Sequence, residues 1–188
     1  MEKDLQRFFE MSLRRLYSAE NQVYDFLNVA AEKATLQQLK GLLVHHRKET
    51  ALQVDRLKKI FEMLNYDLAK TKIGEAEGLL EKGKEVVKSL ATMAFVGKSK
   101  AMEGAIEEAQ EMAKHFEGSP VLDSILLCGG QAIELGEMAA YEALCLVAEE
   151  CGMQEVLSLL KSSLNEEKHM HDVLMQLLKK ELQVQKSA

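Results

Sequence analysis

The feature that most constrains the fold is a set of four long windows in which apolar residues recur at three- and four-residue steps. This period is typical of amphipathic helices that bury one face. The windows run from about Lys3 to Lys33, from Thr35 to Asn65, from Ser119 to Glu150 and from Met153 to Leu182. At about 1.5 Å per residue, each predicted helix is about 45 Å long.

The composition and the turn residues agree with an all-helical chain. Good helix formers dominate, and Pro120 is the single proline. Ser119 followed by Pro120 is typical of a helix start, and Gly152 suits the residue after a helix end. At 188 residues the chain is long enough for a sizeable core, and we predict one domain, residues 1–188.

The connections between the windows predict the topology. Short turns make the first two helices one antiparallel hairpin and the last two another. The segment from Tyr66 to Gly118 holds two shorter helical patterns, near Glu75–Leu90 and Ser99–Phe116. Two hairpins joined by a long crossover are the plan of ferritin-like bundles. We therefore predict an all-α, ferritin-like four-helix bundle whose crossover contains short helices.

The charge and the cysteines exclude several classes of protein. The net charge is −6 and the lysine pairs lie among acidic residues, so we expect no nucleic-acid partner. No run of about 18 apolar residues is present, so we expect no membrane span. The N-terminus has no signal-peptide pattern. The cysteines are three in number and lack zinc spacing, which favours core thiols in a reducing compartment. We expect a cytoplasmic location.

Polar residues interrupt the apolar stripes in a repeated pattern. The first helix of each hairpin carries Glu-x3-Tyr, and the second carries Glu-x3-Gln or Glu-x3-His. The residues are Glu20, Tyr24, Glu49, Gln53, Glu137, Tyr141, Glu167 and His171. Within each hairpin the two glutamates lie at nearly equal distances from the turn. Equal distances mean equal heights in an antiparallel hairpin, so four carboxylates should meet in one layer of the core.

Four unpaired carboxylates in an apolar core predict a bound cation. Each buried ion costs several kcal/mol, and no cationic residue is expected in the layer; Arg56 is the nearest. Residues four apart share a helix face, which adds Gln53 and His171 to the layer. Carboxylates with imidazole suit iron, manganese or zinc, and helical bundles use such sets for dinuclear sites. We predict two iron ions, with manganese, zinc or protonated carboxylates without metal as alternatives.

Several assignments have alternatives that the residues leave open. Tyr24 and Tyr141 are either core aromatics or hydroxyl groups that hold a ligating carboxylate. His46 is either a satisfied core histidine or a ligand. Glu166 and His169 have the usual Glu-x-x-His spacing of bundle sites, whereas the heptad register turns Glu167 and His171 inward.

Five stretches carry a resemblance to a known family. They are LYSAENQV (16–23), HRKETALQVDRL (46–57), AMEGAIEEA (101–109), QAIELGEMAAYEAL (131–144) and LNEEKH (164–169). In this order they resemble the signatures of the YciE/YciF family, ferritin-like bacterial proteins associated with stress responses. The resemblance implies a rubrerythrin-like bundle, a homodimer and a metal site.

The resemblance also extends the ligand set. Rubrerythrin-type sites use two carboxylates three apart on one helix, and Glu134 with Glu137 resembles such a pair. Glu103, on the connecting helix, is a weaker ligand candidate. The alternative interpretation is that it belongs to a solvated acidic face. The family tends to have His at the position of Leu135 and Asp at that of His171. The predicted ligands are thus Glu20, Glu49, Glu134, Glu137, Glu167 and His171.

Two functions follow as hypotheses. In the first, the chain is a dinuclear metal protein that handles peroxide, oxygen or Fe(II); a catalytic version would be a di-iron peroxidase or ferroxidase. In the second, the bundle is not an enzyme, its site is degenerate or structural, and it acts through self-association or a protein partner. The second hypothesis is favoured by Gln53, which stands where a strong metal ligand is expected. It is also favoured by the lack of a rubredoxin-like cysteine knuckle that would deliver electrons.

Overall fold

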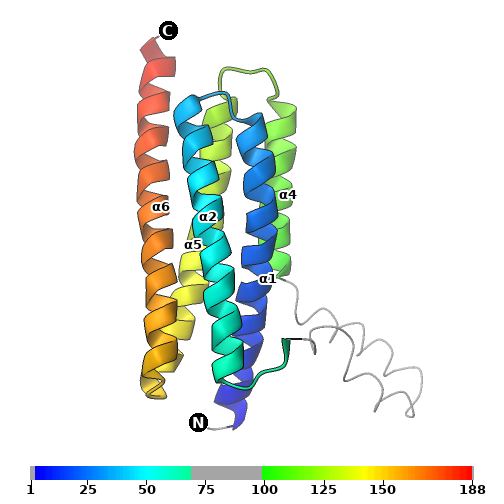
Figure 1. Ribbon diagram of the computed structural model, residues 1–188. Coiled ribbons are helices and arrows are strands. Elements are labelled where there is room, and N and C mark those ends of the chain that lie inside the picture. Colours follow the sequence, from blue (N-terminus) through cyan, green and yellow to red (C-terminus); the bar gives the residue numbers. More distant parts are fainter. Residues whose placement is uncertain (1–2, 69–98, 188) are drawn as a thin grey trace, which may run out of the picture.

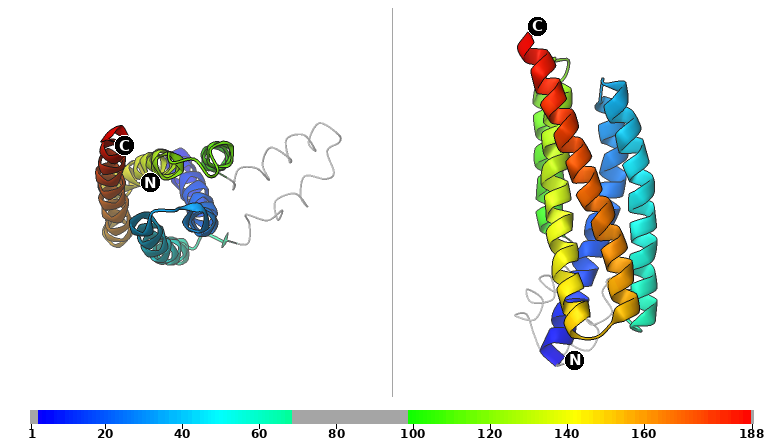
Figure 2. Two further views of the ribbon diagram at one scale, coloured as in Figure 1. Left: turned by 90° about the horizontal axis from the view of Figure 1, so that it is seen from above. Right: turned by 90° about the vertical axis from the view of Figure 1, so that its left-hand side faces the viewer.

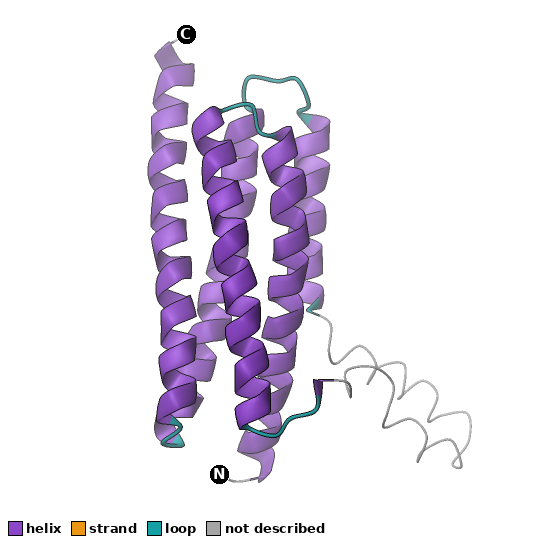
Figure 3. Ribbon diagram, in the orientation of Figure 1, coloured by secondary structure: helices purple, strands orange, loops and turns teal. Residues whose placement is uncertain are grey.

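The computed structural model describes residues 3–68 and 99–187, and all regular structure in these ranges is helical (Figures 1 and 3). The prediction of an all-α chain is confirmed. The five helices are α1 (Lys3–Lys33), α2 (Gln37–Met63), α4 (Lys100–His115), α5 (Leu122–Glu150) and α6 (Gln154–Ser187). The predicted short helix near 99–116 corresponds to α4, whereas the one near 75–90 lies outside the described residues.

The long helices α1, α2, α5 and α6 run side by side as two antiparallel hairpins, and α4 packs along α1 and α5 (Figures 1 and 2). The hairpin partners α1–α2 and α5–α6 make the closest pairs, while α1 also faces α5 and α2 also faces α6. This arrangement brings all four long helices to one shared core. In the described part of the chain, no helix is long and apolar enough to cross a membrane.

The two ends of α5 show one correct prediction and one correction. At its C-terminal end, Gly152 has a φ of +67°, and Met153 N–H donates to the Ala148 carbonyl over 2.9 Å. Glycine tolerates this left-handed turn because it has no Cβ. At the other end, the helix start predicted at Pro120 is two residues early. A short turn precedes α5, in which Leu122 N–H donates to the Ser119 carbonyl.

A buried carboxylate joins the two hairpins at the start of α2. Asp123 in the first turn of α5 accepts from the backbone N–H groups of Thr35 (2.8 Å) and Leu36 (2.9 Å), and from the Thr35 hydroxyl. Leu36 is the N-cap residue of α2 and its own side chain makes no capping bond. Asp123 therefore supplies from another helix the cap that the sequence at this turn lacks.

Replacing Asp123 with alanine should destabilise the fold by about 2–3 kcal/mol, because the backbone donors at the start of α2 lose a charged acceptor. Urea unfolding followed by circular dichroism measures this loss. Asp25→Ala is the matched control, because Asp25 is exposed on α1, and its effect should stay within about 0.5 kcal/mol. Equal effects of the two substitutions would contradict the capping role.

The core consists of two apolar clusters with a polar layer between them. One cluster includes Val23, Phe26 and Leu127, and the other includes Phe9 and Phe61. Each fully buried side chain of this size stabilises the fold by roughly 1.5–3 kcal/mol. The two clusters therefore offset the cost of burying the charged and polar groups that lie between them.

Candidate metal centre

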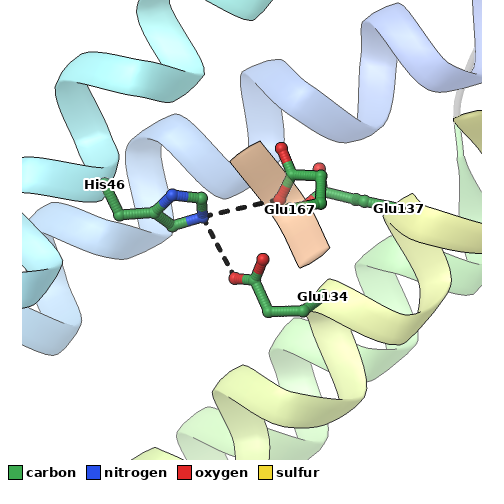
Figure 4. Close-up of side chains that lie close together, drawn as sticks. All are labelled: His46, Glu134, Glu137 and Glu167. Atoms are coloured by element: carbon green, nitrogen blue, oxygen red, sulfur yellow. Dashed lines mark ion pairs between the residues drawn. The ribbon is translucent and has the colours of Figure 1, made fainter. Parts of the chain in front are cut away.

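The polar layer contains a cluster of one histidine and three glutamates from three helices (Figure 4). His46 comes from α2, Glu134 and Glu137 come from α5, and Glu167 comes from α6. Each residue offers one ligand atom, and these four atoms lie within 4.8 Å of one another. None of the four residues is more than 2% exposed. We call this set the His46 cluster.

Helical spacing places these side chains. Glu134 and Glu137 are three residues apart and therefore share the face of α5 that points into the core. Glu167 follows Leu160 and Leu164 at steps of three and four on the buried stripe of α6. The prediction that these glutamates project inward is confirmed by their burial.

The His46 ring lies close to two carboxylates, but neither of its nitrogen atoms forms a hydrogen bond. Its Nε2 is 3.0 Å from Glu134 Oε1 and 3.8 Å from Glu167 Oε2. Neither ring nitrogen is aligned for a hydrogen bond, and one oxygen each of Glu134, Glu137 and Glu167 also lacks a partner. Buried polar atoms are nearly always paired in folded proteins. Four ligand atoms within 4.8 Å of one another, on side chains that carry nitrogen and oxygen atoms without a hydrogen-bond partner, are the arrangement expected of a metal site.

Glu20 borders the cluster and is held by a tyrosine. Tyr141 Oη donates to Glu20 Oε1 over 2.5 Å, and both residues are fully buried. The other Glu20 oxygen has no partner. The sequence left two roles open for Tyr141, and the structure shows that its hydroxyl holds a carboxylate. Tyr24, at the equivalent position of the repeat, instead lies under the Arg47 guanidinium, 3.9 Å from its ring centroid.

Gln53 orients Glu167 from the opposite helix. Its Nε2 donates to Glu167 Oε1 and, over 3.1 Å, to Glu166 Oε2. Glu166 is also paired with Arg56 through bonds of 2.6 and 2.7 Å. Glu167 therefore points into the cluster, whereas Glu166 is engaged at its rim.

The remaining predicted residues lie outside the His46 cluster. Glu49 is half-buried, with His45 Nε2 at 3.4 Å and His46 Nδ1 at 3.5 Å. His171 is half-buried and has Asp172 Oδ1 at 3.6 Å from its Nδ1. His169 is exposed on α6, and Glu103 lies half-buried on α4.

The histidine of the cluster is His46. From the sequence, two interpretations were open for it: a core histidine or a metal ligand. The available signal was its position three residues before Glu49, on the same inward stripe as Leu39 and Leu43. This spacing reverses the order of the Glu-x-x-His pair that bundle sites commonly use. The structure thus brings together Glu134, Glu137 and Glu167 as expected, with His46 beside them.

Burial and neighbouring charges favour protonated groups in this layer. Burial raises the pKa of Glu20 to about 8, against the opposing effect of the Tyr141 hydrogen bond. Burial and then nearby carboxylates also raise the pKa of Glu137 and that of Glu167 well above the ordinary value. For His46, burial lowers the pKa, but Glu134 and other carboxylates outweigh it and raise the pKa to about 10. A cation that entered the cluster would therefore replace protons.

Replacing Tyr141 with phenylalanine should destabilise the fold by about 1–3 kcal/mol, because it leaves a second Glu20 oxygen buried without a partner. Urea unfolding at pH 7 measures the change. Tyr24→Phe is the control at the equivalent position of the repeat and should change stability by less than about 0.5 kcal/mol. A Tyr24 effect as large as that of Tyr141 would show that the Glu20 hydrogen bond is not the cause.

Comparisons with known proteins place the chain in a family. The family model described as "Domain of unknown function (DUF892)" matches residues 4–96 and 92–187. The chain is 30% identical to Protein YciF of Escherichia coli (strain K12) over 166 residues, which are 88% of this chain and 85% of that protein. These matches confirm the family resemblance that the sequence motifs indicate.

Solved structures are similar over almost the whole chain. The E. coli stress protein YciF matches with a TM-score of 0.78 at 28% identity, covering 97% of this chain and 99% of that chain. YcfI from Rhodopseudomonas palustris, provisionally described as a structural protein, matches with a TM-score of 0.73 at 28% identity, covering 93% and 96%. The all-helical fold is thus shared with these relatives.

Proposed function

We propose a function from two premises: the chain belongs to the DUF892 family, and it buries the His46 cluster. The function is that of a ferritin-like stress-response protein with a carboxylate-rich dinuclear metal centre, which handles peroxide, oxygen or Fe(II) in the cytoplasm. One observation carries the proposal. Four buried side chains from three helices converge to within 4.8 Å while several of their nitrogen and oxygen atoms lack partners. The relative YciF is described as a stress protein, which supports a role in the stress response.

The donor set fits iron, with manganese and zinc as alternatives. One imidazole and three carboxylates are borderline-to-hard donors, which suit these divalent ions. Glu134, Glu137, Glu167 and His46 would hold the first ion. Glu20 and Glu49 border the cluster on two sides and are the residues available to a second.

The surrounding residues would set the chemistry of the centre. Bound iron supplies an electron source and sink for peroxide or oxygen. Gln53 fixes the orientation of Glu167, and Tyr141 fixes that of Glu20. The apolar clusters on either side of the layer keep bulk water from the carboxylates, which strengthens their attraction for a cation.

Thermal melting with added metal tests whether the folded chain binds these ions. Anaerobic Fe(II), Mn(II) or Zn(II) at about 100 times the dissociation constant should stabilise the fold by about 2.7 kcal/mol. That corresponds to an increase in Tm of roughly 5–10 °C. EDTA should reverse the increase. A Tm that no metal shifts would contradict the proposed centre.

A second candidate is a non-enzymatic bundle that acts through self-association or a protein partner. It is favoured by the pairing within the layer itself, since Glu20 has Tyr141, Glu167 has Gln53, and His46 lies 3.0 Å from Glu134. The structural description given to YcfI points the same way. We expect a homodimer in either case. Sedimentation velocity measures it, and metal-independent assembly without any metal-induced increase in Tm would favour this second function.

A further inference from the structure

Each carboxylate oxygen of Glu49 faces a histidine of the same helix. Glu49 Oε1 is 3.4 Å from His45 Nε2, and Glu49 Oε2 is 3.5 Å from His46 Nδ1. The side chain of His45 is 66% exposed, that of Glu49 is 21% exposed and that of His46 is 1% exposed. These three side chains therefore lead from solvent into the core. We call His45 and Glu49 the outer pair.

The His46 ring connects the outer pair to the His46 cluster. Its Nε2 is directed at Glu134 and Glu167, and its other nitrogen is turned away from them (Figure 4). That other nitrogen, Nδ1, is buried, has no hydrogen-bond partner and lies on the side of Glu49. One buried ring thus presents one nitrogen to the outer pair and one to the cluster.

The separation of the two side chains in the outer pair suits a divalent cation. Imidazole nitrogen and carboxylate oxygen bind zinc at about 2.0–2.2 Å, so two such ligands of one tetrahedral ion lie about 3.3–3.5 Å apart. His45 Nε2 and Glu49 Oε1 have this separation. Water would complete the coordination, because His45 is exposed. Two protein ligands hold an ion weakly, which suits a position that ions pass through on their way to a tighter site.

The next part of the same rim is unsuited to a cation. Arg56 is seven residues after Glu49, about two helical turns, so both lie on the side of α2 that faces α6. There the Arg56 guanidinium is paired with Glu166 through bonds of 2.6 and 2.7 Å. Because like charges repel, a metal ion is repelled at the Arg56 end of this rim and attracted at the Glu49 end.

We propose that His45 and Glu49 form the position at which a divalent cation such as Fe(II), Mn(II) or Zn(II) first binds the chain, and that the ion passes from there by way of Glu49 and the His46 ring into the cluster. Along this path the ion exchanges its water ligands for protein ligands a few at a time, so no step leaves a bare charge in an apolar surrounding. The role as an entry route rests on the proposed function, whereas cation binding by the outer pair does not.

Binding at the outer pair is tested in the Glu167→Gln chain, whose inner cluster is weakened. Labelled histidine rings are followed by NMR during titration with Zn(II). The His45 signal should shift and saturate, whereas that of His115, exposed on α4, should not. Adding Glu49→Gln should weaken the His45 response at least about tenfold. Asp55→Asn, which changes an exposed carboxylate of the same helix, should leave it unaltered.

Entry is tested by the rate at which the metal-free chain takes up Co(II), a coloured substitute for these ions, followed by visible absorption after rapid mixing. His45→Ala should slow uptake about tenfold, because an outer position that is occupied tenfold less often passes ions tenfold more slowly. The final number of bound ions should stay the same, since His45 lies outside the cluster. His115→Ala removes an exposed histidine elsewhere and should not change the rate.

The two measurements separate this inference from the proposed function. Equal shifts of His45 and His115, or a His45 response that survives Glu49→Gln, would overturn the outer pair. Filling of the cluster at one rate with and without His45→Ala would overturn the route and leave the metal centre intact. A saturable His45 response in a chain whose cluster retains no ion would contradict the dinuclear centre and leave the outer pair as a cation site.

Discussion

Replacing Glu167 with glutamine is expected to weaken Mn(II) or Fe(II) binding at least about 100-fold while the bundle stays folded. Even residues that only orient ligands typically change metal affinity 10–100-fold, and Glu167 offers its own oxygen to the cluster. Glutamine keeps the size of the side chain but removes its charge. The metal-free variant should be at least as stable as the parent, because it no longer buries an ionisable group beside other carboxylates. Calorimetric titration with Mn(II) measures the affinity.

Glu166→Gln is the matched control, one residue earlier on the same helix. Glu166 is paired with Arg56 and lies outside the His46 cluster. Its loss should change metal affinity by less than about tenfold. If Glu166→Gln abolished binding and Glu167→Gln did not, the ligands would be the Glu166 and His169 pair that the sequence offered as the alternative.

The metal-free protein is expected to lose stability as pH rises from about 5 to 9. Glu20, Glu137, Glu167 and His46 all have raised pKa values in the folded state. In the unfolded chain the same groups lose their protons at lower pH, so the folded state binds more protons and its stability falls with pH. The fall begins above the ordinary carboxyl value of 4.5 and continues through the folded value of about 8 for Glu20. We expect a decrease on the order of a few kcal/mol, or roughly 10 °C in Tm.

Metal should reverse this trend. Ligand atoms must be deprotonated to bind, so affinity rises with pH and binding releases protons. Melting curves between pH 5 and 9 should therefore show a metal-induced increase in Tm that grows with pH. Glu137→Gln should flatten the metal-free curve because it removes one of the protonated groups. A metal-free Tm that rises over this range would contradict the protonation states assigned here.

Much of the helical framework follows from the sequence because it depends on local periodicity. The four long windows became the four long helices, and Gly152 ends α5 as expected. The start of α5 was misplaced because the residues before it form a separate turn. The cap of α2 was not predicted either, since Asp123 acts across 87 or more residues of sequence on Thr35 and Leu36.

The candidate site was predicted more completely on α5 than on α2 and α6. Burial of Glu134 and Glu137 follows from their three-residue spacing on an apolar stripe. His171 is four residues after Glu167, and four residues turn a helix about 40° beyond a full circle, so His171 lies half-buried while Glu167 points inward. On α2 the inward face is centred on His46 and Gln53, which leaves Glu49 at the rim. Such rotations are set by packing between helices and not by the sequence of one helix.

The two halves of the repeat also diverge in three dimensions. Tyr141 reaches Glu20 on another helix, whereas Tyr24 meets Arg47 nearer the surface. The Glu-x3-Tyr motif occurs twice, but its neighbours differ: α4 packs on α1 and α5 and has no counterpart on the other side of the described bundle. The sequence repeat alone does not contain this asymmetry.

The most direct test of the central claim is the metal content of the chain after anaerobic loading with Fe(II) and desalting, measured by elemental analysis. A dinuclear centre predicts about two iron ions per chain, their loss in Glu167→Gln, and their retention in Glu166→Gln. If the unsubstituted chain retained no iron, or if Glu167→Gln retained as much, the buried carboxylates and His46 would not form the metal centre proposed here.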